Sequence, residues 1–536
     1  MQKAVTTVEN LDTQAMTELS GASLKKSLHE ILKTRFGYNT FREGQLDVIE
    51  SVLAKRDALA VMPTGGGKSL CYQIPALTKN GLVIVISPLI ALMRDQVQAL
   101  KRMGIPAGAV HSGQEQSEKR EVFNLMNSSD NFILYVSPER VQSEGFRVWL
   151  RAQRRLNLIA VDEAHCVSQW GPDFRQDYHK LNLLRGLCPL VPILALTATA
   201  TPPVLADITR QLGLKNPAQH VYGFYRKNLY YQVETCADNG EKMAWLRQSL
   251  RQFPEGRVLI YCGTRKQSSE LVTELKGEFD SIDYYHAGRT SDRRSKIQTD
   301  FGDGTTRILA ATNAFGMGID HPDVRLVVHF QMPANLESLY QEMGRAGRDG
   351  KDSTCLLLFS KKDKGLQTYF IEQSEAPRDV VSSKWRALET ISQYIEVSEC
   401  RHAGILTYFR DPQRMTRCGH CDVCDPESAR KISTPTSGIE ILAPKKKKAK
   451  KAVETAPLSD KEQLIYDELK TWRRSYAEEH DIAAFIVFSN KTLEDLVRKK
   501  PQSVDELGQV YGFGPNKVEQ LGEEVLAKLK IFLKKS

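Results

Sequence analysis

Short apolar runs of β-strand type alternate with helix-length segments over the first two-thirds of the chain. Residues 24–38 come first and read as a helix, with leucines and Ile31 at helical spacing. The later runs are apolar at nearly every position, which is typical of parallel strands buried on both faces. They form two series, 58–61, 82–86, 132–136, 156–161 and 192–196, then 258–261, 306–310, 326–330 and 355–359. The pattern predicts two α/β domains of similar architecture, each built on a parallel sheet.

The pattern changes after the second series. Residues 361–408 turn helical, and residues 432–458 are rich in Ser, Thr, Pro, Ala and Lys, a composition that cannot bury a core. Apolar positions beyond residue 463 indicate a small helical bundle. The expected organisation is a flexible N-terminus (1–23), two α/β domains (24–222 and 223–360), a helical metal-binding module (361–428), a lysine-rich linker (429–458) and the bundle (459–536).

Length and composition narrow the class of protein. A chain of 536 residues is too long for one core, and its 41% hydrophobic content is that of a soluble globular protein. No apolar run is long enough to span a membrane, and residues 1–20 lack the apolar core of a signal peptide. Ten cysteines are scattered except for one cluster near Cys418, which fits a reducing compartment with one metal site. We therefore expect an intracellular protein.

The net charge of +9 is modest, and its distribution is uneven. Residues 425–458 contain eight basic and four acidic residues, whereas residues 460–536 contain thirteen basic and fourteen acidic. Nearly half of the excess therefore lies in the linker. A basic excess favours polyanionic partners, although a solvated surface is the commoner explanation of so small a charge.

A glycine-rich segment, residues 62–69 (Met-Pro-Thr-Gly-Gly-Gly-Lys-Ser), follows the first short strand. Glycines let backbone N–H groups wrap a phosphate, and the helix expected after them adds positive potential. The lysine then reaches the β- and γ-phosphates and the serine ligates Mg²⁺. The strict motif begins with glycine rather than Met62, and the alternative is a glycine-rich turn with a surface lysine. The strand–loop–helix context favours a nucleotide site, whose expected contacts are Thr64, Gly65, Gly67, Lys68 and Ser69.

Two further motifs would complete a hydrolytic site. Asp162 and Glu163 end an apolar strand, where Asp162 can hold Mg²⁺ through water and Glu163 can deprotonate the attacking water. In the second α/β domain a Gly-Arg-Ala-Gly-Arg frame supplies Arg345 and Arg348, and a guanidinium stabilises the charge that develops in phosphoryl transfer. Arg348 is the first candidate for an arginine finger, with Arg345 assisting; Gln341, in the same stretch, is counted with the nucleotide-binding residues. A surface acidic pair and a solvated basic turn are the alternatives. We expect the nucleotide between the two domains, so that hydrolysis opens and closes the cleft.

With these motifs the chain resembles the RecQ-type DNA helicases of superfamily 2, over residues 24–425 and again over 459–530. The resemblance implies two RecA-like domains, a helical zinc-binding module and an all-α HRDC bundle (helicase and RNase D C-terminal). It also implies that Tyr38 stacks on adenine, Gln45 reads its edge and Arg42 supports the pocket. A glutamine amide can make two hydrogen bonds to the N6/N7 edge of adenine, which gives a preference for ATP a physical basis.

Candidate DNA contacts follow two strands of the first domain. Ser87 and Ser137 each come after a strand and before a proline, and serine as N-cap with proline at the first helical position makes a helix start that can bind phosphate. In the family the corresponding segments line the single-strand track; ordinary βα turns are the alternative.

Residues 166–175 resemble the aromatic-rich loop that couples DNA binding to ATP hydrolysis in RecQ proteins. Aromatic side chains beside an arginine can stack on bases, and a packed loop is the alternative. The candidate contacts are Gln169, Trp170, Phe174 and Arg175. Residues 197–200 and 311–320 match the coupling motifs of the family.

Three thiols in two adjacent Cys-x-x-Cys steps, Cys418, Cys421 and Cys424, indicate a metal site, and Cys400 is the natural fourth ligand. Four thiolates suit tetrahedral structural Zn²⁺, and the resemblance points to the same four. His402 and His420 are the alternative ligands, and a redox dithiol is a less suitable reading.

The chain departs from many RecQ proteins after the zinc module. Only 34 residues, 425–458, precede the bundle, so no winged-helix domain fits there. The lysines of 445–451 are a hypothetical phosphate tether that replaces part of its function, with a solvated linker as the alternative. In the HRDC-like bundle, Trp472, Tyr476 and the basic run 498–500 are candidate contacts, and near-neutral charge favours weak single-strand binding or a protein contact.

The expected function is an ATP-dependent DNA helicase of 3′→5′ polarity that translocates on single-stranded DNA and unwinds duplexes in recombination and repair; polarity and pathway come from the resemblance. The rivals are a translocase that separates strands poorly, an RNA helicase, and a zinc-containing DNA scaffold or annealing protein with a relict ATP site. ATP, Mg²⁺ and structural Zn²⁺ are the expected cofactors. Single-stranded and duplex DNA and single-strand-binding or other repair proteins are the expected partners of a monomeric, cytoplasmic or nucleoid-associated protein.

Overall fold

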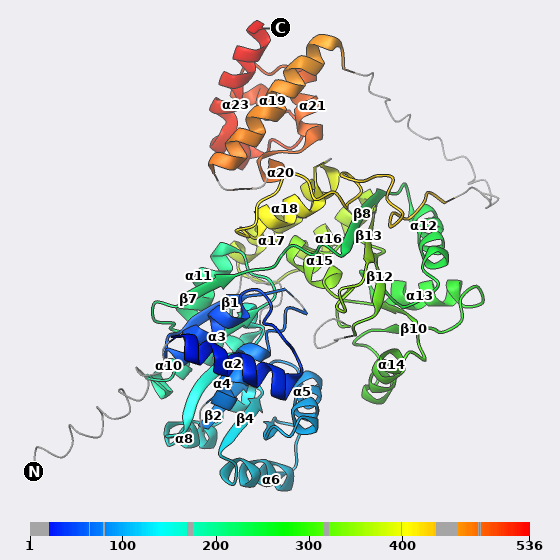
Figure 1. The fold of residues 1–536 in the computed structure, drawn as a ribbon. Coiled ribbons are helices and arrows are strands. Elements are labelled where there is room, and N and C mark those ends of the chain that lie inside the picture. Colours follow the sequence, from blue (N-terminus) through cyan, green and yellow to red (C-terminus); the bar gives the residue numbers. More distant parts are fainter. Residues whose placement is uncertain are drawn as a thin grey trace, which may run out of the picture. The chain divides into compact units, whose positions relative to one another are not determined.

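The computed structural model describes residues 21–63, 65–78, 81–168, 175–315, 321–397, 399–435, 458–480, 482 and 484–535. The chain divides into two compact units, of which the first ends at Gly223 and the second begins at Phe224. Figure 1 follows the chain through them from blue to red.

The first unit contains a seven-stranded sheet in the order β3-β4-β2-β5-β6-β1-β7, and every pair of neighbouring strands is parallel. Its strands are β1 (Ala58–Val61), β2 (Gly81–Ile86), β3 (Ala107–Val110), β4 (Asn131–Val136), β5 (Leu156–Val161), β6 (Ile193–Thr197) and β7 (Ala218–Val221). Its helices are α2 (Gly21–Phe36), α3 (Gln45–Leu53), α4 (Leu70–Thr78), α5 (Ile90–Arg102), α6 (Gln116–Asn127), α7 (Pro138–Val141), α8 (Glu144–Arg151), η1 (Ala164–Val167), α9 (Gln176–His179), η2 (Lys180–Asn182), α10 (Leu183–Leu187) and α11 (Pro202–Gln211).

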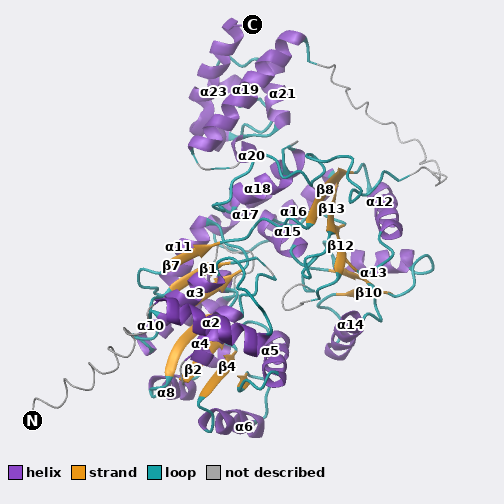
Figure 2. Cartoon of the chain, in the orientation of Figure 1, coloured by secondary structure: helices purple, strands orange, loops and turns teal. Residues whose placement is uncertain are grey.

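The second unit contains a six-stranded parallel sheet in the order β10-β11-β9-β12-β13-β8. Its strands are β8 (Leu229–Thr235), β9 (Arg257–Tyr261), β10 (Ile282–Tyr285), β11 (Ile308–Ala311), β12 (Val324–His329) and β13 (Ser353–Phe359). The helices between them are α12 (Asn239–Gln252), α13 (Arg265–Leu275), α14 (Ser291–Asp303) and α15 (Leu336–Met343). Figure 2 shows these alternating strands and helices in orange and purple.

Both faces of the first sheet are buried, which explains the uniform apolar runs. Alternate residues of β2, Val83 and Val85, pack in one core cluster with residues of α3, α4 and α5. The intervening residues Leu82, Ile84 and Ile86 are buried as well. Period-2 alternation of side chains therefore gives no polar face, and helices cover both sides of the sheet. The predicted fold class, two parallel-sheet α/β domains followed by helical modules, is confirmed.

Four strands, β3, β7, β8 and β10, were not expected from the pattern. β3 is built of Ala and Gly with one Val, and β8 carries a buried glutamine, Gln232. β7 and β10 are edge strands whose residues are mostly half-buried. Edge strands need less apolar sequence than central ones, so these two lack the signal that marked the others.

The rest of the second unit is helical. The segment that follows β13 forms α16 (Lys361–Glu372), α17 (Arg378–Glu396) and α18 (Arg401–Tyr408). The C-terminal bundle consists of α19 (Asp460–Glu479), α20 (Ala484–Val487), α21 (Asn490–Lys499), α22 (Val504–Leu507) and α23 (Pro515–Lys535) around its own apolar core. Trp472 belongs to that core and is only 9% exposed, so its assignment as a nucleic-acid contact is wrong.

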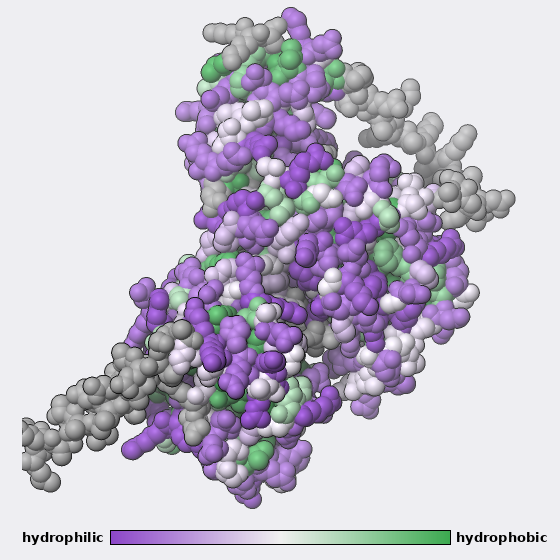
Figure 3. Space-filling model, in the orientation of Figure 1, coloured by the Kyte–Doolittle hydropathy of each residue, from purple (hydrophilic) through white to green (hydrophobic). Residues whose placement is uncertain are grey.

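The visible surface of the described residues is mostly hydrophilic, with small hydrophobic areas spread over several elements (Figure 3). In the part of the chain that the structure describes, no helix is both long enough and apolar enough to cross a membrane.

A buried ion pair fixes the start of α16 to the second sheet. Lys242 is fully buried, and its Nζ donates to Asp363 Oδ2 at 2.6 Å and to the carbonyl oxygen of Phe330 at 2.9 Å. Asp363 also accepts the backbone N–H of Ser360, at the helix start. The carboxylate therefore depends on Lys242 for its compensating charge.

We expect Lys242→Met to destabilise the protein by ~3–5 kcal/mol, because it leaves the Asp363 carboxylate buried without its cation. Chemical denaturation followed by tryptophan fluorescence measures the effect. Lys266→Met is the matched control, since Lys266 pairs with Glu270 on the exposed face of α13. Equal stability of the two variants would contradict the prediction.

Candidate functional site

The glycine-rich segment connects β1 to α4 in the first unit. Gly65 and Gly67 have φ values of 78° and 76°, a left-handed conformation that side chains with a Cβ rarely adopt. Lys68 Nζ donates to the carbonyl oxygens of Met62 at 3.2 Å and Pro63 at 3.5 Å, so its ammonium lies inside the loop. Ser69 directly precedes α4. Thr64 lies outside the described residues.

Gln45 and Arg42 hold this loop from the side. Gln45 Nε2 donates to the carbonyl oxygens of Gly66 at 3.1 Å and Gly67 at 3.0 Å, and its Oε1 accepts the backbone N–H of Arg42 at 2.8 Å. The Arg42 guanidinium donates to the carbonyl oxygen of Gly65. Tyr38, beyond the end of α2, is 55% exposed. Of the three residues expected to bind the base, Arg42 and Gln45 therefore contact the phosphate loop directly.

The acidic pair follows β5 in a strained turn. Glu163 has φ 48°, which is rare for a residue other than glycine, and such strain is typical of functional sites. Burial and the neighbouring Glu163 raise the pKa of Asp162, while Lys68 and the backbone N–H of Glu163 lower it. Burial is the largest of these effects, so the pKa of Asp162 lies above its usual value.

His165 lies between Glu163 and the end of β6. His165 Nδ1 lies 3.4 Å from Glu163 Oε2 and 2.8 Å from the hydroxyl of Thr197. That hydroxyl donates to the carbonyl oxygen of Thr199 at 2.9 Å. Because its one hydrogen is used there, we assign the proton between His165 and Thr197 to Nδ1. A movement of Thr197 would therefore displace a hydrogen-bond partner of His165, the side chain that contacts Glu163.

The Gly-Arg-Ala-Gly-Arg turn lies at the end of α15 in the second unit. Arg226 donates to the carbonyl oxygens of Gly344, Ala346 and Gly347 at 3.0–3.4 Å, and Asn228 also donates to Gly347. A Cβ on Gly347 would lie 2.4 Å from Asn228 Nδ2. The turn that carries the arginines is thus fixed by its carbonyl groups.

The two arginines differ in exposure. Arg345 is buried, with 7% of its surface exposed, and Arg348 is half-buried. Gln341 lies on α15 itself, one turn before them. The helix and the turn therefore place three of the expected nucleotide-binding residues in one short segment of the second unit.

The expected DNA contacts are described only in part, since Gln169, Trp170 and Phe174 lie outside the described residues. The side chains of Ser87 and Ser137 are buried, and their hydroxyls have no hydrogen-bond partner among the described residues. Arg175 Nη1 donates to the carbonyl oxygen of Pro88 at 3.3 Å, which ties the end of the aromatic-rich segment to the segment after β2.

The expectation of a serine N-cap holds for one segment and fails for the other. Ser137 is the N-cap residue of α7, with Pro138 at the first helical position, although its side chain makes no capping hydrogen bond. After β2, however, α5 begins only at Ile90 and its N-cap is Leu89. The N-cap prediction for Ser87 is therefore wrong, because the helix begins two residues later, after a bend at Pro88 and an extended Leu89.

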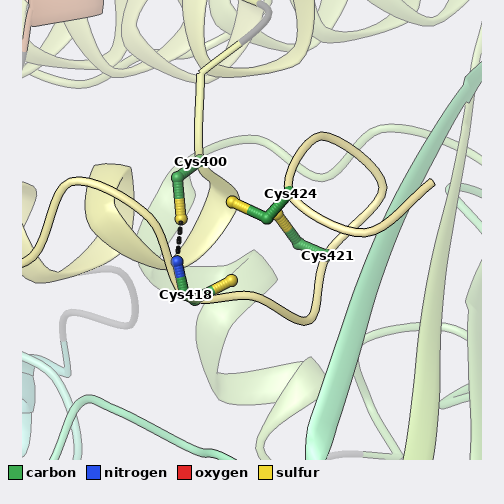
Figure 4. A group of neighbouring side chains, drawn as sticks. All are labelled: Cys400, Cys418, Cys421 and Cys424. Carbon is green, nitrogen blue, oxygen red and sulfur yellow. Dashed lines mark hydrogen bonds between the residues drawn. The ribbon is translucent and has the colours of Figure 1, made fainter. Parts of the chain in front are cut away.

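The four cysteines converge between α18 and the loop after it. The sulfur atoms of Cys400, Cys418, Cys421 and Cys424 all lie within 4.8 Å of one another (Figure 4). Backbone N–H groups of Ala403 and Cys418 donate to the sulfur of Cys400, at 3.4 and 3.3 Å. Hydrogen bonds with Cys400 and Cys418 lower the pKa of Cys421 far below its usual value. The same coupling raises the pKa of Cys400 and Cys418, so the suitability of the site for Zn²⁺ rests on the close approach of four thiols.

The neighbouring histidines have other contacts. His420 Nε2 bonds the Tyr225 hydroxyl at 2.8 Å and its Nδ1 bonds the carbonyl oxygen of Leu229 at 3.1 Å, so both of its nitrogens are used. His402 stacks on Tyr231, with ring centroids 4.1 Å apart. These contacts favour the four-cysteine set over one that includes His420.

The metal loop is anchored to the edge of the second sheet. Cys421 forms a parallel β-bridge with Tyr231 of β8, and the backbone N–H of Asp422 donates to the carbonyl oxygen of Tyr231 at 2.9 Å. The Asp422 carboxylate accepts from Val233 N–H and from the buried guanidinium of Arg401. The metal loop therefore pairs with the outer edge of β8, the last strand of its sheet.

Sequence reasoning missed the residues that position these groups. Arg226 and Asn228 hold the arginine turn, and they lie more than 100 positions away in the chain. His165, which contacts Glu163 and Thr197, was not among the predicted site residues. The sequence offered one signal for such positioning residues: a hydroxyl or titratable residue at the last position of an apolar strand. Tyr261 at the end of β9 and His329 at the end of β12 are examples.

Four family models match the chain in order: DEAD/DEAH box helicase (residues 42–208), helicase conserved C-terminal domain (241–350), RecQ zinc-binding (361–425) and HRDC domain (462–529). Tandem parallel-sheet domains with a phosphate loop, an acidic pair and an arginine turn define a superfamily 2 helicase. The zinc-binding match covers the cysteine cluster, so the predicted zinc-binding module is confirmed.

The chain belongs to the RecQ helicase family. It is 32% identical to "ATP-dependent DNA helicase RecQ" of Bacillus subtilis, over 94% of this chain and 98% of that protein. It is 41% identical to "ATP-dependent DNA helicase RecQ" of Haemophilus influenzae, over 75% of this chain and 64% of that protein. The chain thus spans a little less than two-thirds of the Haemophilus influenzae protein.

Solved structures share the fold of the helicase region. A structure of Mss116p bound to ssRNA and AMP-PNP matches with a TM-score of 0.51 at 20% identity, over 70% of this chain and 83% of that one. The helicase MrfA bound to DNA and AMPPNP matches with a TM-score of 0.51 at 18% identity, over 68% of this chain and 56% of that one. At this identity the likeness concerns the fold alone.

We expect Cys418→Ser to lose bound zinc and to unfold the metal loop, since structural Zn²⁺ contributes folding free energy. Metal analysis of the purified chain by mass spectrometry checks this. Cys188→Ser, which replaces a buried cysteine of the first unit, is the control and should retain about one zinc ion per chain. Full zinc content in Cys418→Ser would refute the assignment.

Proposed function

We propose that this protein is an ATP-dependent DNA helicase that translocates on single-stranded DNA, with 3′→5′ polarity, and unwinds duplexes in recombination and repair. The observation that carries the proposal is that the phosphate loop with Lys68 follows β1 and the acidic pair Asp162–Glu163 follows β5, two parallel strands of one sheet. The names of the relatives that match over most of this chain support the same activity.

The phosphate loop is the proposed site of ATP. Its backbone and Lys68 bind the β- and γ-phosphates, and Tyr38, Arg42 and Gln45 hold the base. Mg²⁺, held by Ser69 and Asp162, supplies charge neutralisation at the phosphates. The buried Oε2 of Glu163 makes no hydrogen bond within the described part of the chain, so it can accept a proton from the attacking water. Gln341, Arg345 and Arg348 are the proposed contribution of the second unit to phosphate binding and hydrolysis.

Single-stranded DNA is proposed to bind along the segments after β2 and β4 and along residues 169–175. The link between Arg175 and Pro88 supports this grouping, because it joins two of the three segments. The hydrogen bond between Thr197 and His165, and the 3.4 Å contact of His165 with Glu163, give a route by which occupancy at the strand ends can affect hydrolysis.

Protein partners of the repair machinery, a monomeric state and a cytoplasmic or nucleoid-associated location remain part of this proposal. The lysines of 445–451, outside the described residues, are proposed as a phosphate contact. The family matches for the zinc module and the HRDC domain leave only residues 426–461 between them. This short connection favours a second candidate, a DNA-stimulated translocase that separates strands poorly.

We expect Glu163→Gln to lower the kcat of DNA-stimulated ATP hydrolysis by ~10²–10⁴-fold, because the general base is lost while the side chain keeps its shape. ATP binding, followed with a fluorescent ATP analogue, should change little. Glu144→Gln, an exposed change on α8, is the control and should hydrolyse ATP normally. Normal turnover in Glu163→Gln would overturn the role of the acidic pair.

Strand separation on forked and 3′- or 5′-tailed duplexes distinguishes the two candidates. A helicase unwinds the forked and 3′-tailed substrates only with ATP and only with Glu163 intact. Strong DNA-stimulated hydrolysis without strand release would identify the translocase, and stimulation by RNA rather than DNA would identify an RNA helicase. ATP-independent annealing that survives in Lys68→Ala would favour a scaffold.

A further inference from the structure

Helix α18 of the zinc module extends from a cysteine of the metal cluster to α15, the helix that precedes the arginine turn. Cys400 is the N-cap residue of α18, and Tyr408 is its last residue. The Tyr408 hydroxyl donates to Oε1 of Glu337 at 2.7 Å. Glu337 lies in the first turn of α15. One hydrogen bond therefore joins the end of α18 to the start of α15.

The carboxyl group of Glu337 depends on this hydrogen bond. Glu337 is buried, with 8% of its surface exposed, and its Oε2 has no hydrogen-bond partner in the described part of the chain. A buried polar group that loses a partner bears the cost of its desolvation without compensation. The Tyr408 hydroxyl therefore stabilises a buried carboxyl group that is already short of donors.

The residue after α18 makes a second contact with α15. The Phe409 ring stacks on Phe224, with centroids 4.3 Å apart and planes at 7°, and its centroid lies 5.3 Å from that of Tyr340 on α15. The rings of Phe224 and Tyr340 are also 5.3 Å apart. None of the three residues has more than 2% of its surface exposed. The three rings therefore form a closed cluster that packs the end of α18 against α15.

The backbone of Phe224 is fixed on both sides by the same two elements. Its N–H donates to Oδ2 of Asp411, which follows α18, at 2.9 Å. Its carbonyl oxygen accepts from the Tyr340 hydroxyl at 3.2 Å. The other carboxylate oxygen of Asp411 accepts the backbone N–H of Gln413 at 2.8 Å, so this carboxylate is itself held in place. Hydrogen bonds therefore fix the cluster as well as ring packing.

The two contacts lie on one face of α15 and lead directly to the arginine turn. Glu337 and Tyr340 are three residues apart, a spacing that places both on the same side of a helix. The carbonyl oxygen of Tyr340 accepts the backbone N–H of Gly344 at 2.9 Å, and the next residue is Arg345. A shift of this face of α15 therefore moves the first residue of the turn.

We propose that the end of α18 positions the arginine turn for ATP hydrolysis: Tyr408 and Phe409 hold α15 at Glu337 and Tyr340, and α15 in turn sets the position of the arginines. Tyr408 and Phe409 are thus positioning residues, which act on the reaction only through α15. This inference rests on the proposed role of the arginine pair. It gives the zinc module a part in hydrolysis that is separate from binding its metal.

Tyr408→Phe tests the inference, because it removes the hydroxyl and keeps the ring. We expect the kcat of ATP hydrolysis with single-stranded DNA to fall by about 10-fold, since a misplaced arginine stabilises the transition state less well. Binding of a fluorescent ATP analogue should change little, and zinc content should stay at about one ion per chain. Glu337→Gln keeps an oxygen that can accept from Tyr408 and should retain kcat. A fall of kcat only in proportion to a loss of ATP-binding chains would indicate a merely structural role and overturn the inference.

Tyr230→Phe is the matched control. Tyr230 is a buried tyrosine of β8, and its hydroxyl donates to the carbonyl oxygen of Asp425 at 2.8 Å. This hydrogen bond also joins the second unit's sheet to the zinc module, but it ends on the metal loop rather than on α15. Tyr230→Phe should therefore keep its kcat. A wild-type kcat in Tyr408→Phe, or an equal loss in Tyr230→Phe, would overturn the inference.

A combination of variants separates this inference from the proposed function. Because Tyr408 acts through the arginines, Tyr408→Phe should cause no further loss of kcat when Arg345→Ala and Arg348→Ala are both present. A further loss would overturn the link. If the two arginine substitutions together leave hydrolysis intact, the proposed role of the arginine pair fails, and that result is independent of Tyr408.

Discussion

The parallel hydrogen-bonded sheet is the constraint on which the rest of the molecule depends. Because helices bury both faces of each sheet, polar chemistry is excluded from the strands and can only begin where they end. The phosphate loop follows β1, the acidic pair follows β5, and Thr197 closes β6. In the second sheet Tyr261 closes β9 and His329 closes β12. Parallel register brings these ends to the same edge of their own sheet.

The second sheet is completed by the zinc module rather than by another strand. An unpaired sheet edge exposes backbone donors and acceptors, and β8 would be such an edge. The metal loop takes up part of it through Cys421 and Asp422, while Arg401 neutralises the Asp422 carboxylate. The metal site is therefore a structural continuation of the helicase domain, and the cysteines do more than close a local loop.

The sequence predicted those parts of the fold whose signal is local. The apolar run of β5 matched its strand at both ends, since a central parallel strand has no polar position to interrupt the pattern. β7 and β10 were not predicted, because an edge strand can be half-exposed and then lacks a continuous apolar run. The cysteine set could be proposed from its spacing, because that signal is local too. Ser87 was wrongly predicted as an N-cap, because the direction of the chain after a strand is decided by packing.

The candidate site divides in the same way. Lys68 and Glu163 lie in short motifs that can be recognised from neighbouring residues alone. Arg226, which holds the arginine turn, lies more than 100 residues from it in the chain, so no local pattern records the contact. Residues in chemical motifs could be proposed from the sequence, whereas the residues that hold them in position required the tertiary structure.

The side-chain amide of Gln45 is already occupied by the chain itself: its two polar atoms bond Gly66, Gly67 and the backbone of Arg42. For Nε2 to donate to an adenine edge, it would have to give up one of the two glycine carbonyls, so recognition of the base would exchange one partner for another with a small net gain. The same exchange would remove part of the lateral support of the phosphate loop. Base recognition and the conformation of the loop would then depend on one side chain.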